Sequence, residues 1–176
     1  MDLAAVATGP FSPTDVHARL ARMAGRWTGT AKTYADPSNR EAAEVAPWDG
    51  TIEMLLGGRF LRFAYVSRAM GEPIAGELTL AYEKGDRLFR MSWIDSLHTG
   101  GAILVSESKP VPEGGAVATI SALGTFFVGE GQPRWGWRTE LDDQTDGALR
   151  VRMFNIKPDG DESIGVEIDL TREDRR

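Results

Sequence analysis

The chain has 176 residues, which corresponds to one domain and is long enough to bury a sizeable core. Its formal net charge of -6 argues against nucleic acid or an anionic membrane surface as the partner, because both require a basic surface. It has no cysteine, which excludes disulfides, thiolate nucleophiles and cysteine-ligated zinc. With two histidines, His17 and His98, a three-histidine site is excluded and no metal is expected.

The first residues carry no targeting pattern. Residues 1–12 are mostly small and apolar without periodicity, and we expect them to form a flexible arm. They lack the basic start and the long apolar run of a signal peptide. No stretch of the chain approaches the roughly 18 apolar residues that span a bilayer. We therefore expect a soluble, cytoplasmic protein.

One short amphipathic helix is predicted over residues 13–24. Ser12 would provide the hydroxyl cap, Pro13 the first helical position and Asp15 an acid in the first turn. Gly25 would end the helix. Its apolar side is formed by three residues at helical spacing: Val16, Leu20 and Met23.

From Arg26 onward the hydrophobic period changes to two, which indicates half-buried strands. The clearest case is the segment 74–82, in which apolar residues and small or polar residues alternate. Turn residues divide the chain into about ten such segments with short connections. This pattern predicts an all-β fold, an antiparallel up-and-down barrel rather than a sandwich, because closure removes exposed strand edges. The single domain would cover residues 13–172, followed by a solvated tail over residues 173–176.

Several motifs resemble those of DUF1579, a bacterial family of lipocalin-like proteins without an assigned activity. The motifs are MAGRWTG at residues 23–29, LLGGRFLRFAY at 55–65, MGEPIAGELTLAY at 70–82 and WIDSLHTGG at 93–101. The resemblance runs from about His17 to Arg172 and implies a calycin-type barrel. In such barrels the tryptophan of a Gly-x-Trp step closes one end beneath an arginine of the last strand, which implies this role for Trp27 and Arg172. His98 departs from the small or apolar residue that the family leads us to expect.

A closed barrel of this size usually encloses an interior, and the residues that face it are the candidate ligand contacts. Trp93 follows Phe89 and Met91 at a spacing of two. On later strands, Trp135 and Trp137 share one face, and Met153 shares a face with Leu149 and Val151. These side chains are predicted to form the cavity wall, with plain core packing as the alternative.

Asp95 and His98 follow the same strand and are the weak catalytic candidates. Parity places Asp95 inward at the strand end, where a carboxylate could orient a polar ligand group or act as a base. Alternatively, Asp95 and Ser96 cap the turn through its backbone amides. His98 could be a proton shuttle with Asp95, an axial haem ligand or an exposed loop residue.

Arg62 could face either side of its strand. Facing inward it would anchor an anion and would need a buried acid, for which Glu107 is the candidate. Facing outward it would cover apolar surface with its aliphatic stem. Tyr65 lies on the opposite parity, so without a bulge only one of these two side chains can line the interior.

The leading hypothesis is a binding module that holds one small, apolar or amphipathic molecule, with Arg62 or Asp95 at its polar end. No resident cofactor is expected. The alternatives are a cofactor-independent lyase or isomerase using Asp95, Arg62 and Tyr65 or His98, and a haem-binding barrel using His98. A third hypothesis is an interaction protein that uses the outside of the barrel. A homodimer is a further expectation.

Overall fold

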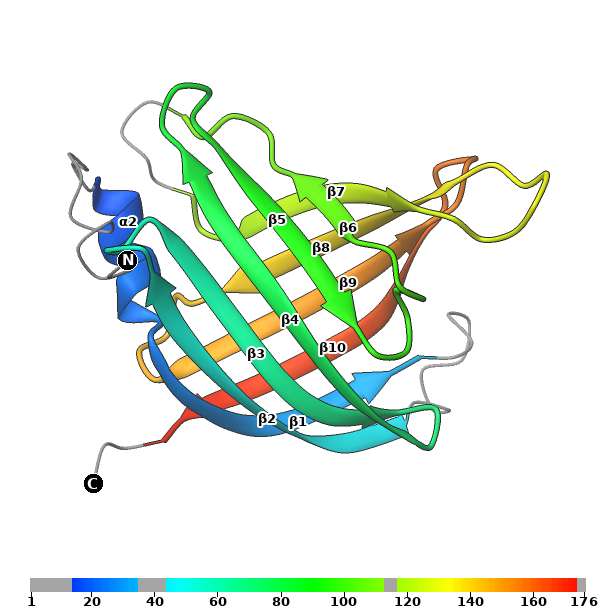
Figure 1. The fold of residues 1–176 in the computed structure, drawn as a ribbon, viewed down its shortest axis with the longest axis horizontal. Coiled ribbons are helices and arrows are strands. Elements are labelled where there is room, and N and C mark those ends of the chain that lie inside the picture. Colours follow the sequence, from blue (N-terminus) through cyan, green and yellow to red (C-terminus); the bar gives the residue numbers. More distant parts are fainter. Residues whose placement is uncertain (1–13, 35–43, 113–116, 174–176) are drawn as a thin grey trace, which may run out of the picture.

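Within the part of the chain that the structure describes, ten antiparallel strands close into a barrel, and helix α2 lies at one end of it (Figure 1). The computed structural model describes residues 14–34, 44–112 and 117–173. The elements are α2 Asp15–Arg22, β1 Gly25–Thr33, β2 Glu44–Leu55, β3 Phe60–Ala69, β4 Glu72–Glu83, β5 Leu88–Asp95, β6 Leu104–Glu107, β7 Ile120–Phe126, β8 Trp135–Asp142, β9 Ala148–Ile156 and β10 Glu162–Arg172. The predicted all-β barrel of about ten strands with a short helix in front is confirmed. The predicted arm 1–12 and the tail beyond residue 173 lie outside the described residues.

Helix α2 is shorter than the predicted helix over residues 13–24. Its N-cap is Thr14, whose backbone amide donates to Nδ1 of His17 at 3.2 Å. Ser12 and Pro13, which the sequence pattern places at the helix start, lie outside the described residues. The helix ends at Met23, which is its C-cap. In the described part of the chain, no helix has the length and apolar character needed to cross a membrane.

Two strands are shorter than the alternation in the sequence predicts, and the pairing between them is short. The segment predicted over residues 102–108 forms only β6, and the segment over residues 117–128 forms only β7. These two strands pair through just two residue pairs, Ser106 with Gly124 and Glu107 with Leu123. A Cβ atom on Gly124 would lie 2.4 Å from the carbonyl oxygen of Val105, so the strands approach closely at this point because the residue is glycine.

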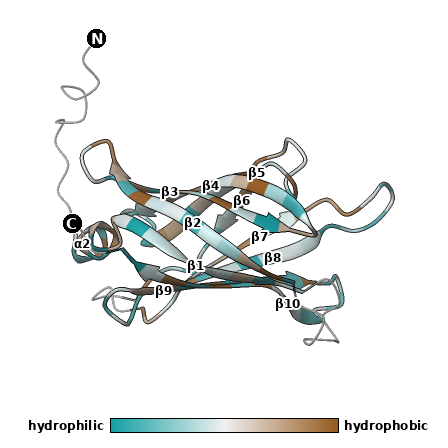
Figure 2. Ribbon diagram, turned by 90° about the horizontal axis from the view of Figure 1, so that it is seen from below, coloured by the Kyte–Doolittle hydropathy of each residue, from teal (hydrophilic) through white to brown (hydrophobic). Residues whose placement is uncertain are grey.

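The lumen is tightly packed at the helix end. Hydrophobic and hydrophilic residues alternate along the strands (Figure 2). The apolar residues form the buried set. The largest of the most completely buried side chains come from α2 and from the halves of the strands nearest to it. They include Trp27, Phe89, Leu20, Met23, Ile52 and Leu61. The opposite end, where β1 ends and β5 ends, is the barrel mouth.

Trp27 and Arg172 lie together at the closed end, in the arrangement that the resemblance implies. Trp27 is 1% exposed, and its indole N–H donates to the backbone carbonyl of Met23 at 2.9 Å. The guanidinium of Arg172 lies 4.8 Å from the centre of the Trp27 ring, and it also donates to the backbone carbonyl of Arg22. The last strand is thereby tied to both the first strand and the helix.

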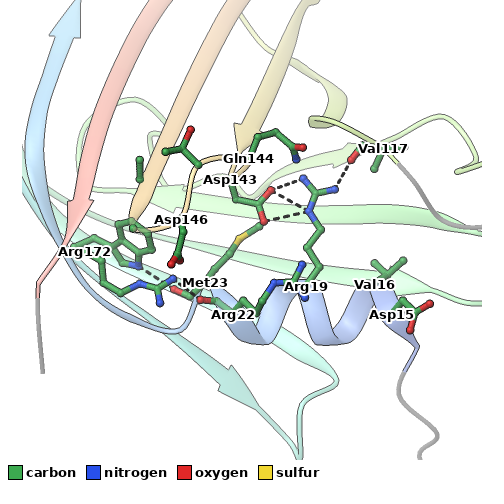
Figure 3. A pocket seen from close by; sticks show the side chains of 14 residues that line it. Asp15, Val16, Arg19, Arg22, Met23, Val117, Asp143, Gln144, Asp146 and Arg172 are labelled. Atoms are coloured by element: carbon green, nitrogen blue, oxygen red, sulfur yellow. Dashed lines mark hydrogen bonds and ion pairs between the residues drawn. The ribbon is translucent and has the colours of Figure 1, made fainter.

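A polar hollow of about 640 Å³ lies between α2 and the turn that joins β8 to β9 (Figure 3). Arg19 crosses it and forms an ion pair with Asp143, with an Nε–Oδ1 distance of 2.9 Å. The same guanidinium donates to the backbone carbonyls of Val117 and Ala118. The ion pair between Arg19 and Asp143 therefore links helix α2 to the turn between β8 and β9 at this end of the barrel.

We predict that Trp27→Ala lowers the free energy of unfolding by about 3–5 kcal/mol, since the substitution leaves a large cavity and removes the contact with Arg172. Trp135→Ala is the matched control, because Trp135 is half-buried at the mouth. Urea denaturation of both variants measures the difference. Equal losses in the two variants would contradict a closing role for Trp27.

Candidate functional site

A cavity of about 650 Å³ opens at the barrel mouth, opposite α2. Its lining comes from the mouth ends of several strands and from the connections that follow β5 and β7. The residues that matter for its chemistry are Tyr34, Trp93, His98, Phe126, Arg134 and Trp137. Ala102, Ile103 and Leu104 also line it, so the cavity extends to the place where β6 and β7 diverge.

Five aromatic side chains, here called the aromatic belt, run across the lumen below the mouth: Trp48, Tyr65, Trp93, Trp137 and Phe126. Trp48 stacks on Tyr65 with ring centres 4.2 Å apart. The indole N–H of Trp93 donates to the Tyr65 hydroxyl at 2.7 Å. Trp93 stacks on Trp137 at 5.6 Å, and Phe126 meets Trp137 edge-to-face at 5.8 Å. Each ring is therefore held by a neighbouring ring from another strand, which gives the cavity a rigid wall.

Small inward residues make room for the belt. On the intervening strands, Gly124 lies opposite Trp137 and pairs with Ser106, which lies opposite Met91, and these small residues leave room for Trp93 and Trp137 to stack. A bulge in β10 leaves Gly165 without a partner on β9. Gly165 lines the cavity, and a bulge at this point bends the strand at the rim.

Asp95 and His98 form a linked pair at the rim. The Asp95 side chain is fully buried, and its Oδ1 accepts the backbone amides of Leu97, His98 and Thr99. Its Oδ2 accepts a hydrogen bond from Nδ1 of His98 at 2.8 Å. The carboxylate therefore both caps the turn and orients the imidazole, whose ring centre lies 6.1 Å from that of Trp93. Nε2 of His98 has no hydrogen-bond partner within the described ranges.

The environment changes the acidity of two of these groups. Burial by itself would raise the pKa of Asp95, but the hydrogen bonds from His98 and the turn amides outweigh it and lower the pKa. Burial, followed by the nearby Asp95 carboxylate, raises the pKa of Tyr65. At neutral pH the Asp95 side chain is thus a carboxylate and the Tyr65 side chain a neutral phenol. Across residues 14–34, 44–112 and 117–173, no group of three or more His, Asp or Glu side chains could hold a metal ion.

Arg62 and Glu107 do not reach the interior. Arg62 lies on the outer face and forms ion pairs with Glu53 at 2.9 Å and with Glu77 at 2.6 Å. Glu107 also lies on the outside and pairs with Arg90. Of the two orientations considered for Arg62, the structure has the outward one, because acidic neighbours on β2 and β4 pair with it there. The prediction that an inward Arg62 would pair with Glu107 is therefore wrong: Arg62 pairs with Glu53 and Glu77, and Glu107 pairs with Arg90.

The other candidates are distributed along the lumen. Met153 is 4% exposed and packs in the core, and Trp135 is half-buried against Phe126. The structure brings Tyr65, Trp93, Asp95, His98 and Trp137 together at one end, whereas Arg62 and Glu107 lie apart from them. Sequence reasoning missed four groups at the mouth: Trp48, Tyr34, Arg134 and Asn155. Parity with Met153 could have pointed to Asn155, but nothing local marks Arg134 in its loop.

Comparisons with known proteins identify a family and a fold. The family model described as "Protein of unknown function (DUF1579)" matches residues 12–172. The crystal structure of Rv2717c from M. tuberculosis is similar with a TM-score of 0.61 and 11% identity, covering 93% of this chain and all of that one. The S-type phycobiliprotein lyase CPES from Guillardia theta is similar with a TM-score of 0.50 and 12% identity, covering 92% of this chain and 94% of that one. Identities this low show a shared fold alone. No curated protein sequence gives a significant match.

We predict that Gly76→Ala displaces Tyr65 and breaks its hydrogen bond with Trp93. A Cβ atom on Gly76 would lie 2.3 Å from the Tyr65 hydroxyl oxygen and 2.9 Å from Cβ of Asp95. Overpacking of this kind costs about 1–3 kcal/mol of unfolding free energy and should alter the near-UV circular dichroism of the aromatic belt. Gly85→Ala is the control, because a Cβ atom there meets nothing within 4 Å. An unchanged stability of Gly76→Ala would show that the belt is not tightly packed.

The carboxylate of Asp95 should make the stability of the fold depend on pH. Because its pKa is lower in the folded chain than in the unfolded chain, its charged form stabilises the fold above its ordinary pKa of about 3.9. This stabilisation is lost as the pH falls through the folded-state pKa. Wild type should therefore exceed Asp95→Asn in unfolding free energy above about pH 5, and the difference should shrink below about pH 4. Urea denaturation at several pH values measures it, and a difference that stays constant with pH would contradict this role of the carboxylate.

Proposed function

The chain belongs to the DUF1579 family, and we propose that it is a small-molecule-binding barrel that holds one mostly apolar ligand in its mouth cavity. The observation that carries the proposal is the contrast between the two ends of the lumen. The hollow at the helix end is lined mainly by charged and polar groups, and Arg19 and Asp143 pair across it, while the mouth end keeps a cavity of about 650 Å³ with mainly apolar and aromatic walls. Pockets that bind drug-sized molecules measure about 300–1,000 Å³ and have mainly apolar and aromatic walls.

The wall of the cavity suits a flat or flexible apolar body. Trp93, Phe126 and Leu104 present apolar surface, and their positions are fixed by contacts with neighbouring strands. Preformed walls lower the entropic cost of binding, because few side chains need to be ordered when the ligand arrives. A ligand would thus find its apolar contacts already in place.

A catalytic function has weaker support. The proposed set required Arg62 to converge with Asp95 and with Tyr65 or His98 on one point of the interior, but Arg62 faces outward. The Tyr65 hydroxyl is engaged by Trp93. What remains is the Asp95–His98 pair, which could position a ligand or, through Nε2, bind haem. Haem therefore belongs among the compounds to be tested.

An interaction surface is the second candidate, and exposed apolar side chains favour it. Ile94 and Val105 are 46% and 60% exposed on the outer side of β5 and β6. Soluble proteins rarely leave adjoining apolar side chains uncovered without a role. A homodimer through this face would cover them without involving the mouth cavity.

We predict that Leu104→Trp fills the cavity and lowers the affinity for apolar probes by at least about tenfold, which is the effect of losing one well-packed apolar contact of about 1.4 kcal/mol. The control is Val105→Trp, which adds the same bulk at the next residue but on the outer face. Isothermal titration calorimetry with 2-naphthol, decanol and haem measures binding. Native mass spectra of the same samples report any co-purified ligand and the oligomeric state. Equal affinities in the two variants would place the binding site outside the mouth cavity.

A further inference from the structure

The polar groups that line the mouth cavity are biased towards hydrogen-bond donors. The whole chain carries 26 acidic and 20 basic side chains, yet the cavity lining contains no Asp or Glu. The groups in the lining that can carry positive charge are Arg134 and His98. The carboxylate in contact with this lining, Asp95, is buried beneath it and accepts three backbone amides and the His98 ring. Its oxygens are thus occupied.

Arg134 stands at the rim as a cation without an acidic partner. Its Nε and Nη2 donate to the hydroxyl and the backbone carbonyl of Thr125 at 3.0 and 2.8 Å, which fixes the guanidinium against β7. Within the described ranges, no Asp or Glu forms an ion pair with it, in contrast to the outer-face arginines Arg62, Arg90 and Arg150. Its Nη1 remains available at the edge of the cavity.

Trp137, in the wall of the cavity, holds a second donor without a partner among the described residues. Its side chain lines the cavity, and its buried indole N–H has no acceptor among the described residues. An indole nitrogen can only donate, and a buried donor without an acceptor costs about 1–3 kcal/mol. The donor that the cavity offers directly is therefore Arg134 at the rim, and a second unmatched donor lies buried in a ring of the wall.

From this donor-rich lining without acids we infer that the ligand is an apolar carboxylate, with its body against the aromatic belt and its carboxylate at Arg134. The inference rests on the proposed function and names the chemical class of its ligand. A carboxylate accepts charge-assisted hydrogen bonds from a guanidinium, which are about twice as strong as those between neutral groups. An amine would face an unpaired cation, and a neutral ligand would leave Arg134 without its counter-charge.

Two matched pairs of probes test the inference: 2-naphthoate against 2-naphthamide, and decanoate against decanamide. Each pair keeps the apolar body and exchanges only the charged group for a neutral one. In calorimetry at low ionic strength, wild type should prefer each carboxylate by about three- to tenfold, since Arg134 is exposed and partly screened. Arg134→Gln should abolish the preference by lowering the carboxylate affinities more than the amide affinities. Arg68→Gln, which removes an exposed outer-face arginine at the same end of the barrel, should retain it.

The outcomes separate the two proposals. If the amides bind as tightly as the carboxylates, or if Arg134→Gln keeps the preference, the inference is overturned while the binding function stands. If none of the four probes binds to folded wild type, both are overturned. The unfolding curve of Arg134→Gln is recorded alongside, and decanamide binding to this variant reports that its cavity is intact.

Discussion

Closure of the sheet between its first and last strands is the constraint on which the rest of the structure depends. Seven residue pairs join β1 to β10, from Trp27 with Arg172 to Thr33 with Val166. Once the sheet is closed, every strand has one face towards the lumen, and side chains two residues apart share it. Apolar residues from ten separate strands therefore meet in one core. Closure also places the remaining side chains on the outer surface, where arginines and carboxylates of neighbouring strands form ion pairs.

The difference between the two ends of the lumen follows from which side chains occupy it. At the helix end, Trp27 and Met23 lie beneath the helix, and Arg172 covers Trp27. At the mouth, the large rings of the aromatic belt hold one another by stacking and by the Trp93–Tyr65 hydrogen bond. Rings fixed in this way cannot collapse into the remaining space, so the cavity persists above them. The polar groups at its rim, Arg134 and His98, are held by Thr125 and Asp95.

The sequence predicted the fold far better than the site, for a physical reason. Alternation with a period of two is repeated in nearly every strand, so errors at single positions, such as the ends of β6 and β7, leave the barrel intact. The direction of a side chain is harder to predict in a strand whose odd-numbered and even-numbered positions both carry apolar or amphipathic residues. In β3 the arginine at position 62 fits either side by sequence, and in the fold it faces outward, where Glu53 and Glu77 on the neighbouring strands pair with it.

Residues that depend on register and loops were beyond reach from the sequence. Trp48 meets Tyr65 only because the register of β2 against β3 places Gly50 opposite that tyrosine. Arg134 reaches the rim through a loop whose path no periodicity describes. Asp95 and His98 could be identified from the sequence because they stand in one turn, where Asp95 was expected either to cap the backbone amides or to act together with His98. In the structure Asp95 does both: it caps the turn and orients the imidazole.

The most direct test of the binding function is a crystal structure of the protein saturated with 2-naphthoate. We expect electron density for the naphthalene rings between Trp93, Trp137 and Phe126, with these three side chains in the positions described above. A mouth filled by the protein's own side chains, or density for the compound on the outer surface alone, would contradict it.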